Sequence, residues 1–346
     1  MLFRSVTPVS KPAKKTKAAS RSKPPAPKPR STQSQQPHKN AQLNLNEAVE
    51  RLSKLCEWSV PLYSSTCEWG WMVGTDHDYP HGADDGRVIF NPGEKISHEQ
   101  VAAARHLVIR SDVQVDPEIL NPDLRALVCG YKTNDKWLKA VIARCPRLQC
   151  LETNGTVGNK GLACLADLPD LVALEITHRS VNFKPVLPAL PALQQLIMRL
   201  ERNLPLDSIV AATPALQAFG IWESQAAHLH GIEGWTELRR LDLCSCGSLR
   251  QLDELAGLHH LRDLRLSYVG GNRAYESLFL ENLRELEVIG LNEVKVRNLE
   301  RLLALPALRA IACHGGVKRS AKHGVVINPD GWIGPEDCRP GWLDSP

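Results

Sequence analysis

A short leucine pattern that recurs nine times constrains this chain more than any other feature of its sequence. Each copy reads Leu, two variable residues, an apolar residue, one variable residue and a further apolar or small residue. The copies start 22 to 25 residues apart. Their anchor leucines are Leu124, Leu148, Leu171, Leu193, Leu216, Leu238, Leu261, Leu283 and Leu308. A period of this length indicates stacked units that share one core.

The pattern predicts one β-strand in each copy. Side chains alternate along a strand, so the third and fifth residues after each anchor point into the core. The second, fourth and sixth residues point to the opposite face. Six of the nine anchors have proline two residues earlier, and proline ends the connecting segment before the next strand begins. We therefore expect a parallel sheet with helical or 3₁₀ connectors behind it.

This period and signature resemble the leucine-rich repeat family. The resemblance implies an α/β solenoid, a horseshoe whose parallel sheet lines the concave face, with about nine repeats and terminal caps. The family usually places Asn or Cys eight residues after the anchor, and Cys246 is the residue in this chain that fits that position well. We therefore expect the turns after the strands to vary in shape.

Composition divides the chain into four segments. Residues 1–45 form a basic tail rich in Pro, Lys and Ser, which cannot bury enough apolar surface to fold and is therefore predicted to be disordered. Residues 46–105 are expected to form an N-terminal capping region that includes an acidic His/Asp loop. The solenoid is expected over 106–316 and a C-terminal cap over 317–346. Residues 1–46 hold ten Lys and Arg and no acid, so the excess of positive charge belongs to the tail.

The concave face is the predicted binding site. Ala218 and Gly220 leave a hollow beside Ile197, and Arg199 and Trp222 wall it, which are residue types enriched at binding hot spots. An alternative is that Trp222 simply folds over the sheet. Further along, the same face carries charges of both signs. The predicted partner-binding residues are Trp222, Arg199, Ile197, Gly220, Arg240, Asp242, Arg265, Tyr268 and Glu287.

These features predict a non-catalytic module that binds a protein partner, as a scaffold, an effector or a toxin-neutralising binder. The sequence contains no HExxH, GxSxG, Walker or CxxC motif, and no cofactor is predicted. An open sheet rarely offers the deep pocket that a small-molecule enzyme needs. A face that binds nucleic acid would be mainly basic, whereas this one mixes both signs.

Two alternatives stay open. The 76–85 loop concentrates Asp and His, which can hold a divalent metal or act as acid and base in hydrolysis, with the repeats as a substrate-recognition arm. The same composition is typical of an exposed loop. The basic tail is suited to electrostatic association with nucleic acid or an anionic surface.

The sequence favours a cytoplasmic location. It contains no apolar run long enough to span a membrane and no secretory signal peptide. Several cysteines fall at core positions of the repeats, where they are expected to be buried thiols rather than disulfides. The composition of the tail also fits export as an effector or targeting to an organelle.

Overall fold

A computed structural model describes residues 87–313, apart from gaps at 92, 110–113, 130–132, 179, 181–182, 201–203, 205, 272 and 309, together with 326–328. The chain divides into two compact units, 1–39 and 40–346, and every described residue belongs to the second. The predicted tail, the 76–85 loop and most of the C-terminal cap lie outside the described residues.

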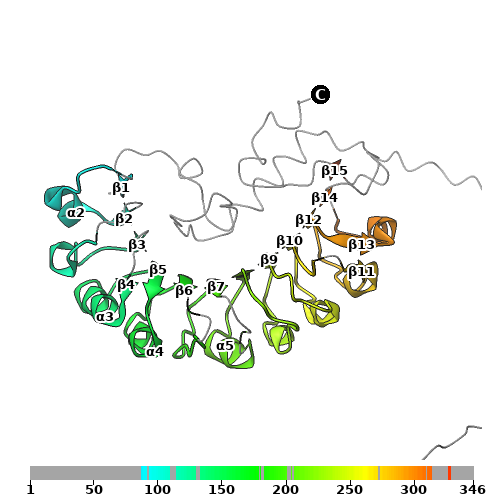
Figure 1. The fold of residues 1–346 in the computed structure, drawn as a ribbon, viewed down its shortest axis with the longest axis horizontal. Helices are drawn as coiled ribbons and strands as arrows, with labels where there is room; N and C mark the ends of the chain where they lie inside the picture. Colours follow the sequence, from blue (N-terminus) through cyan, green and yellow to red (C-terminus); the bar gives the residue numbers. More distant parts are fainter. Residues whose placement is uncertain are drawn as a thin grey trace, which may run out of the picture. The chain divides into compact units, whose positions relative to one another are not determined.

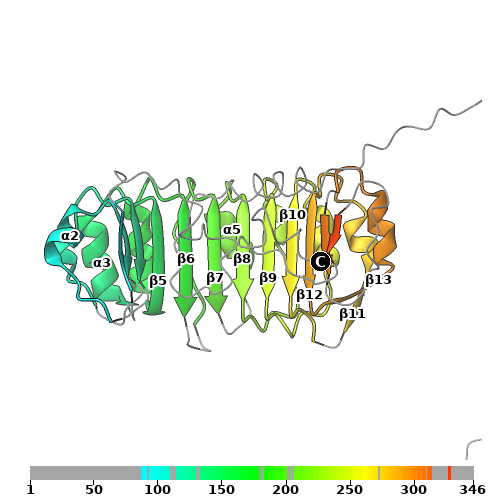
Figure 2. The ribbon, with the colours of Figure 1, turned by 90° about the horizontal axis from the view of Figure 1, so that it is seen from above.

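One parallel sheet organises the described part of the chain. Its strands follow one another in sequence order, as Figure 2 shows. The strands on this path are β1 (Arg87–Phe90), β2 (His106–Ile109), β3 (Ala126–Cys129), β5 (Cys150–Thr156), β6 (Ala173–His178), β7 (Gln195–Leu200), β8 (Ala218–Trp222), β9 (Arg240–Cys244), β10 (Asp263–Ser267), β12 (Val288–Asn292), β14 (Ala310–Cys313) and β15 (Val326–Asn328). The short β4 (Thr133–Asn134) pairs with β5, and β11 (Ala274–Glu276) pairs with β13 (Lys295–Arg297) in a second sheet.

Short helices connect the strands. In the described part they lie on the outer side of the curve, and the large sheet lines its inner side (Figure 1). They are α2 (His98–Ala103), η1 (Pro117–Ile119), α3 (Asp135–Arg144), α4 (Asn159–Leu162), η2 (Ala163–Asp167), α5 (Leu206–Ala212), η3 (Ile232–Gly234), η4 (Asp253–Gly257), η5 (Ser277–Leu280) and η6 (Leu299–Ala304). This arrangement confirms the leucine-rich repeat solenoid. No helix among the described residues has the length and apolar character needed to cross a bilayer.

Local signals explain where the longer connectors begin. The Asn134 side chain accepts a hydrogen bond from the Trp137 N–H at 2.9 Å and so caps α3. The Trp137 indole then donates to the carbonyl of Val115 at 2.9 Å, which ties α3 to the preceding connector. Trp235 repeats this contact four repeats later, because its indole donates to the Thr213 carbonyl at 3.1 Å. Buried indoles thus link successive connectors.

The predicted core column is confirmed. The third residue after each anchor is fully buried from the first to the seventh repeat, and neighbouring members lie beside each other in register. These residues are Leu127, Leu151, Leu174, Leu196, Phe219, Leu241 and Leu264. The sheet is therefore held by a continuous apolar row that no single repeat can bury alone.

The eighth repeat is shifted by three residues from its predicted position. Strand β12 pairs with β10 so that Ile289 lies beside Leu264. The anchor is therefore Leu286, and the prediction of Leu283 was wrong. Both leucines are buried and both start a sequence that fits the pattern, so the leucines alone do not decide between them. The concave residues of this repeat are Val288, Gly290 and Asn292, not Glu285, Glu287 and Ile289.

Two strands lie beyond the range 106–316 predicted for the solenoid. Strand β1 pairs with β2, and β15 pairs with β14, both in parallel register. Neither carries the leucine signature, because Asp85 and Gly324 stand where the anchor leucine would be. The sheet therefore continues past the repeats that the leucine pattern identifies.

Candidate functional site: the concave face and its rim

The concave face has two chemically different halves. From β2 to β8 its side chains form an apolar cluster that is separate from the main core, here called the apolar half. Its buried members are Val108, Ala126, Val128, Cys150, Ala173, Ile197 and Trp222. Two buried acids, Glu152 and Glu175, lie side by side within the same strands. On β9 and β10 the face is charged, and this ionic half consists of Arg240, Asp242, Asp263 and Arg265.

Trp222 lies at the boundary between the two halves. Its indole Nε1 donates a hydrogen bond to Oδ2 of Asp242 at 3.0 Å. Asp242 lies beside Gly220 in the strand register, so the indole turns back along β8 to reach the neighbouring strand β9. Ile197, Ala218 and Gly220 are all buried. The residues predicted to line the hollow are therefore buried, and Trp222 lies as in the alternative in which it folds over the sheet.

One carboxylate organises the ionic half. Both oxygens of Asp263 accept hydrogen bonds from the Arg265 guanidinium, at 3.0 Å from Nε and 3.1 Å from Nη2. The Nε of Arg240 lies 3.3 Å from Oδ2 of the same carboxylate. All three side chains are at most 7% exposed. Such a two-pronged contact is strong because the planar guanidinium matches the carboxylate geometry.

Asp242 has a different environment, although two arginines are nearby. Both guanidinium groups contact the carboxylate of Asp263, whereas the indole of Trp222 donates to Asp242. Burial raises the pKa of Asp242 to about 8, and the Trp222 hydrogen bond and the two arginine charges only partly offset it. Its Oδ1 is buried without a hydrogen-bond partner in the described part of the chain. Burial therefore favours the protonated form of the Asp242 carboxyl.

The carboxyl ends of the central strands form an exposed rim. The residue after each of β8, β9, β10 and β12 has left-handed backbone, with φ between 53° and 59°. These residues are exposed, and they are Glu223, Ser245, Tyr268 and Glu293. The first three N–H groups donate to the end of the next strand at 2.8 to 2.9 Å, which holds the turns in a fixed form. Arg199, whose Nη2 pairs with Oε1 of Glu223, completes the rim.

Glu287 does not belong to the concave face. It lies one residue after the corrected anchor, on the edge where the strands begin, and its Oε1 is 3.9 Å from Nη1 of Arg262. Arg262 also pairs with Glu285, and the ring of His260 contacts Glu285 at 3.0 Å. The hydrogen bond from His260 is the main cause that lowers the pKa of Glu285. These charges form an ion-pair network on the opposite edge from the rim.

The nine predicted residues therefore fall into three places. Six of them are buried in or beside the concave face: Ile197, Gly220, Trp222, Arg240, Asp242 and Arg265. Arg199 and Tyr268 lie on the rim, and Glu287 lies on the other edge. Sequence reasoning missed Glu223, although it occupies the seventh position after its anchor, the same position as Ser245 and Tyr268. That shared position is the signal that would have found the rim.

The thiols of this face are not set up as nucleophiles. Burial raises the pKa of Cys150 to about 12 and that of Cys244 to about 11. A thiol attacks as its thiolate, so these groups stay unreactive near neutral pH. Among the described residues, one group of three side chains has the geometry to hold a metal ion, namely His228, His230 and Glu254. That group belongs to the connectors, not to the concave face.

No protein-family model and no curated protein matches the sequence. Solved structures match at low identity. A leucine-rich repeat protein of Leptospira interrogans is 21% identical, with 53% of this chain and 47% of that chain covered and a TM-score of 0.36. An internalin of Listeria monocytogenes is 13% identical (67% and 87% covered, TM-score 0.33). Toll of Drosophila, in its complex with Spatzle, is 18% identical (62% and 27% covered, TM-score 0.43).

This chain thus spans about half the length of the Leptospira protein, of which it covers 47%, and about a quarter of Toll, of which it covers 27%. The leucine-rich repeat fold itself rests on features of this chain. They are the leucine period, the sequential order of parallel strands and the in-register core column.

Proposed function

We propose that this leucine-rich repeat chain is a non-catalytic module that binds a protein partner along the rim of its concave face. The observation that carries the proposal is the position of Tyr268. It is one of two large hydrophobic side chains that are exposed in the described part of the chain, and it is 50% exposed. Aromatic side chains bring a large contact area to an interface at low entropic cost, which suits Tyr268 to anchor a partner.

The backbone supports this use of Tyr268. With φ of 54°, Tyr268 adopts the left-handed backbone conformation, which residues other than glycine seldom occupy. Its N–H donates to the Asn292 carbonyl at 2.9 Å, which holds the conformation. The ring is therefore presented to solvent on a rigid turn, so binding requires little ordering of the chain.

The charges of the rim favour a protein partner over nucleic acid. Arg199 is paired with Glu223, and Glu293 adds a second exposed acid to the same row. Phosphate backbones require several unopposed cations, which this row does not offer. A protein surface with an apolar pocket for the tyrosine and complementary charges around it fits better, with electrostatics setting selectivity.

The buried residues of the concave face support the rim from below. The bidentate pair between Asp263 and Arg265 fixes β10, the strand that ends at Tyr268. Trp222 ties the end of β8 to β9 through Asp242. In this proposal Tyr268, Arg199 and Glu223 touch the partner, and the buried side chains hold the three strand ends in place.

A capture experiment with full-length protein tests the proposal. Immobilised wild type is compared with Tyr268→Ala/Arg199→Glu and with Val186→Ala, which removes the other exposed large hydrophobic at a distant connector. Circular dichroism first confirms that all three are folded. We expect one protein to be retained by wild type and by Val186→Ala and lost with the double variant. If the double variant retains the same proteins as wild type, the rim is not the binding site.

A further inference from the structure

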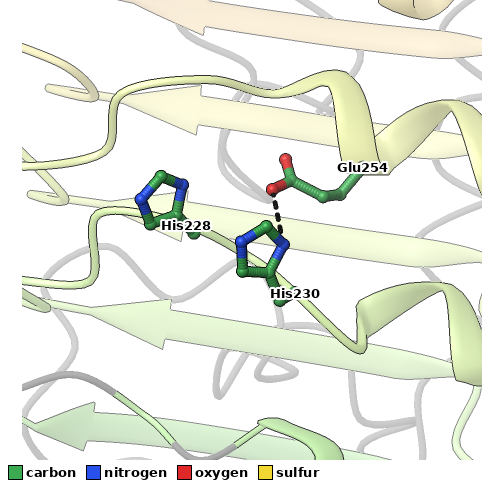
Figure 3. Close-up of side chains that lie close together, drawn as sticks. All are labelled: His228, His230 and Glu254. Atoms are coloured by element: carbon green, nitrogen blue, oxygen red, sulfur yellow. Dashed lines mark ion pairs between the residues drawn. The ribbon is translucent and has the colours of Figure 1, made fainter.

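The connectors on the outer side carry a cluster of side chains that neither the repeat nor the rim explains. His228 and His230 lie on the loop that leads into η3, and Glu254 lies on η4 of the next repeat (Figure 3). One ligand atom from each residue lies within 4.8 Å of the other two. Nδ1 of His230 is already 3.1 Å from Oε1 of Glu254.

The loop places both imidazoles on the same side. Leu229 between them is buried, so alternation along the chain turns His228 and His230 outward together. Their rings stack in parallel, with centroids 4.9 Å apart and planes 5° apart. Gly231 follows with φ of 91°, and a Cβ there would lie 2.1 Å from Oδ1 of Asp207. The turn after the histidines therefore depends on glycine.

Glu254 is held equally firmly. Its neighbour Leu255 is fully buried in the main core. The N–H of Arg250 donates to the carbonyl of Ala227 at 3.0 Å, which joins the two connectors next to the cluster. Oε1 of Glu254 contacts His230, whereas Oε2 is buried and has no hydrogen-bond partner among the described residues. A buried carboxylate oxygen without a partner is costly unless a cation or donor satisfies it.

We propose that His228, His230 and Glu254 form a binding site for a divalent transition-metal ion such as Zn²⁺. Two imidazoles and one carboxylate are a donor set that Zn²⁺ accepts, and three protein ligands leave one position for water or another ligand. Ligands around a tetrahedral zinc lie about 3.3–3.6 Å from one another. The three donor atoms, all within 4.8 Å, reach that geometry through small side-chain rotations.

The bound ion would join two neighbouring repeats. Its ligands come from the connector between β8 and β9 and from the connector between β9 and β10. Zinc would thus hold η3 and η4 together on the outer side and stabilise the native state over the unfolded chain. This role is independent of the partner proposed for the rim.

Zinc binding to the full-length protein tests the proposal, measured by equilibrium dialysis with metal analysis. The variants are His228→Ala/His230→Ala and Glu254→Gln, because glutamine keeps the shape of Glu254 but is a poor zinc ligand. The control is His259→Ala/His260→Ala, which removes two exposed histidines from the connector that also carries Glu254, one of them in a similar contact with Glu285 at 3.0 Å.

We expect wild type and the control to bind one zinc equivalent more than the double histidine variant. Glu254→Gln should weaken this site by at least about tenfold, since even outer ligand partners change metal affinity that much. Zinc should also raise the melting temperature of wild type more than that of the double variant. Equal zinc binding by wild type and the double variant would overturn the proposal, as would wild-type affinity in Glu254→Gln.

Discussion

The apolar half and the ionic half of the concave face occupy the same sheet, in the same register, yet they are stabilised by different interactions. In the apolar half, small and branched side chains such as Ala173 and Ile197 are buried by packing. In the ionic half, the Asp263 carboxylate contacts two guanidinium groups, and all three side chains are also buried. The leucine core behind the sheet is continuous through both halves. The repeat therefore determines the backbone and leaves the chemistry of the concave face free to vary.

The difference has an energetic consequence. Apolar burial contributes roughly 25 cal/mol per Å² of buried surface and is spread over many side chains. One substitution therefore removes only a small part of the total stabilisation. Buried charges depend on specific partners, because the cost of removing them from water is met only by close and well-aligned contacts. We therefore expect the ionic half to depend strongly on one residue and the apolar half to depend moderately on several.

The largest expected effect comes from Asp263→Ala. This change removes the carboxylate that Arg240 and Arg265 both contact in the interior, and we expect the free energy of unfolding to fall by about 3–5 kcal/mol. Urea unfolding measures it. The control is Asp123→Ala, which breaks an equally short pair with Arg147 at 3.0 Å on the surface and should cost less than about 1 kcal/mol. Similar losses in both variants would contradict the contrast drawn between buried and exposed pairs.

In the apolar half, Ile197→Ala should lower the free energy of unfolding by about 2–4 kcal/mol. The side chain is fully buried, so its removal loses transfer free energy and leaves a cavity. The milder Ile197→Val should cost about 0.5–1.5 kcal/mol, since it removes a single methyl group. The same urea experiment applies to both. If alanine and valine cost equally little, Ile197 is not packed as the structure shows.

The carboxyl at the boundary should make stability depend on pH. Burial raises the pKa of Asp242 from 3.8 to about 8 in the folded state, so the folded state binds this proton more tightly than the unfolded state does. Stability from this group is complete below about pH 4 and is lost as pH rises towards about 8. Asp242→Asn keeps an acceptor for the Trp222 indole and removes the titration.

We therefore expect wild type to lose stability relative to Asp242→Asn between pH 4 and pH 8, at up to about 1.4 kcal/mol per pH unit. Urea unfolding of both proteins at several pH values measures the difference, and other titrating groups cancel in the comparison. A difference that stays constant with pH would mean that Asp242 is ionised in the folded protein.

The smallest expected effect concerns the rim. Its left-handed turns follow β8, β9, β10 and β12, and two of these strands, β9 and β10, carry the ionic half. Ser245 has φ of 56°, which costs a residue with a side chain about 1–2 kcal/mol relative to glycine. Ser245→Gly should therefore raise the free energy of unfolding by about 0.5–1 kcal/mol after the greater freedom of glycine in the unfolded chain is subtracted. Ser248→Gly, at an exposed turn nearby, is the control and should not stabilise the protein. If both variants are stabilised equally, the gain in Ser245→Gly does not come from its left-handed backbone conformation.

Periodicity alone predicted the strands, the core column and the outer connectors, because burying one leucine in each unit is the dominant interaction in such a stack. It failed where that signal was missing or doubled. Strands β1 and β15 lack the anchor leucine, and in the eighth repeat Leu283 and Leu286 both satisfy the pattern. The second error moved Glu287 onto the wrong face.

The candidate site was harder to predict for a different reason. The alternation of side chains along a β-strand predicts the face of the sheet on which a side chain lies, but not the position of the far end of a long side chain. Trp222 was expected beside an open hollow, and its indole instead turns back to Asp242. The cluster of His228, His230 and Glu254 was not foreseen at all, because its members come from two repeats and meet only when those repeats stack. Contacts between repeats depend on side-chain torsions that a single sequence does not reveal.

The sequential strand order also determines how far a local disturbance can travel. In the sheet between β5 and β12 each strand hydrogen-bonds to the strand before it and the strand after it along the chain. The energetics of such a stack reduce to a term for each unit and a coupling term for each junction, as in a one-dimensional lattice. Partial opening at one junction can then leave more distant units folded, and amide hydrogen exchange along the chain would show protection changing repeat by repeat rather than all at once.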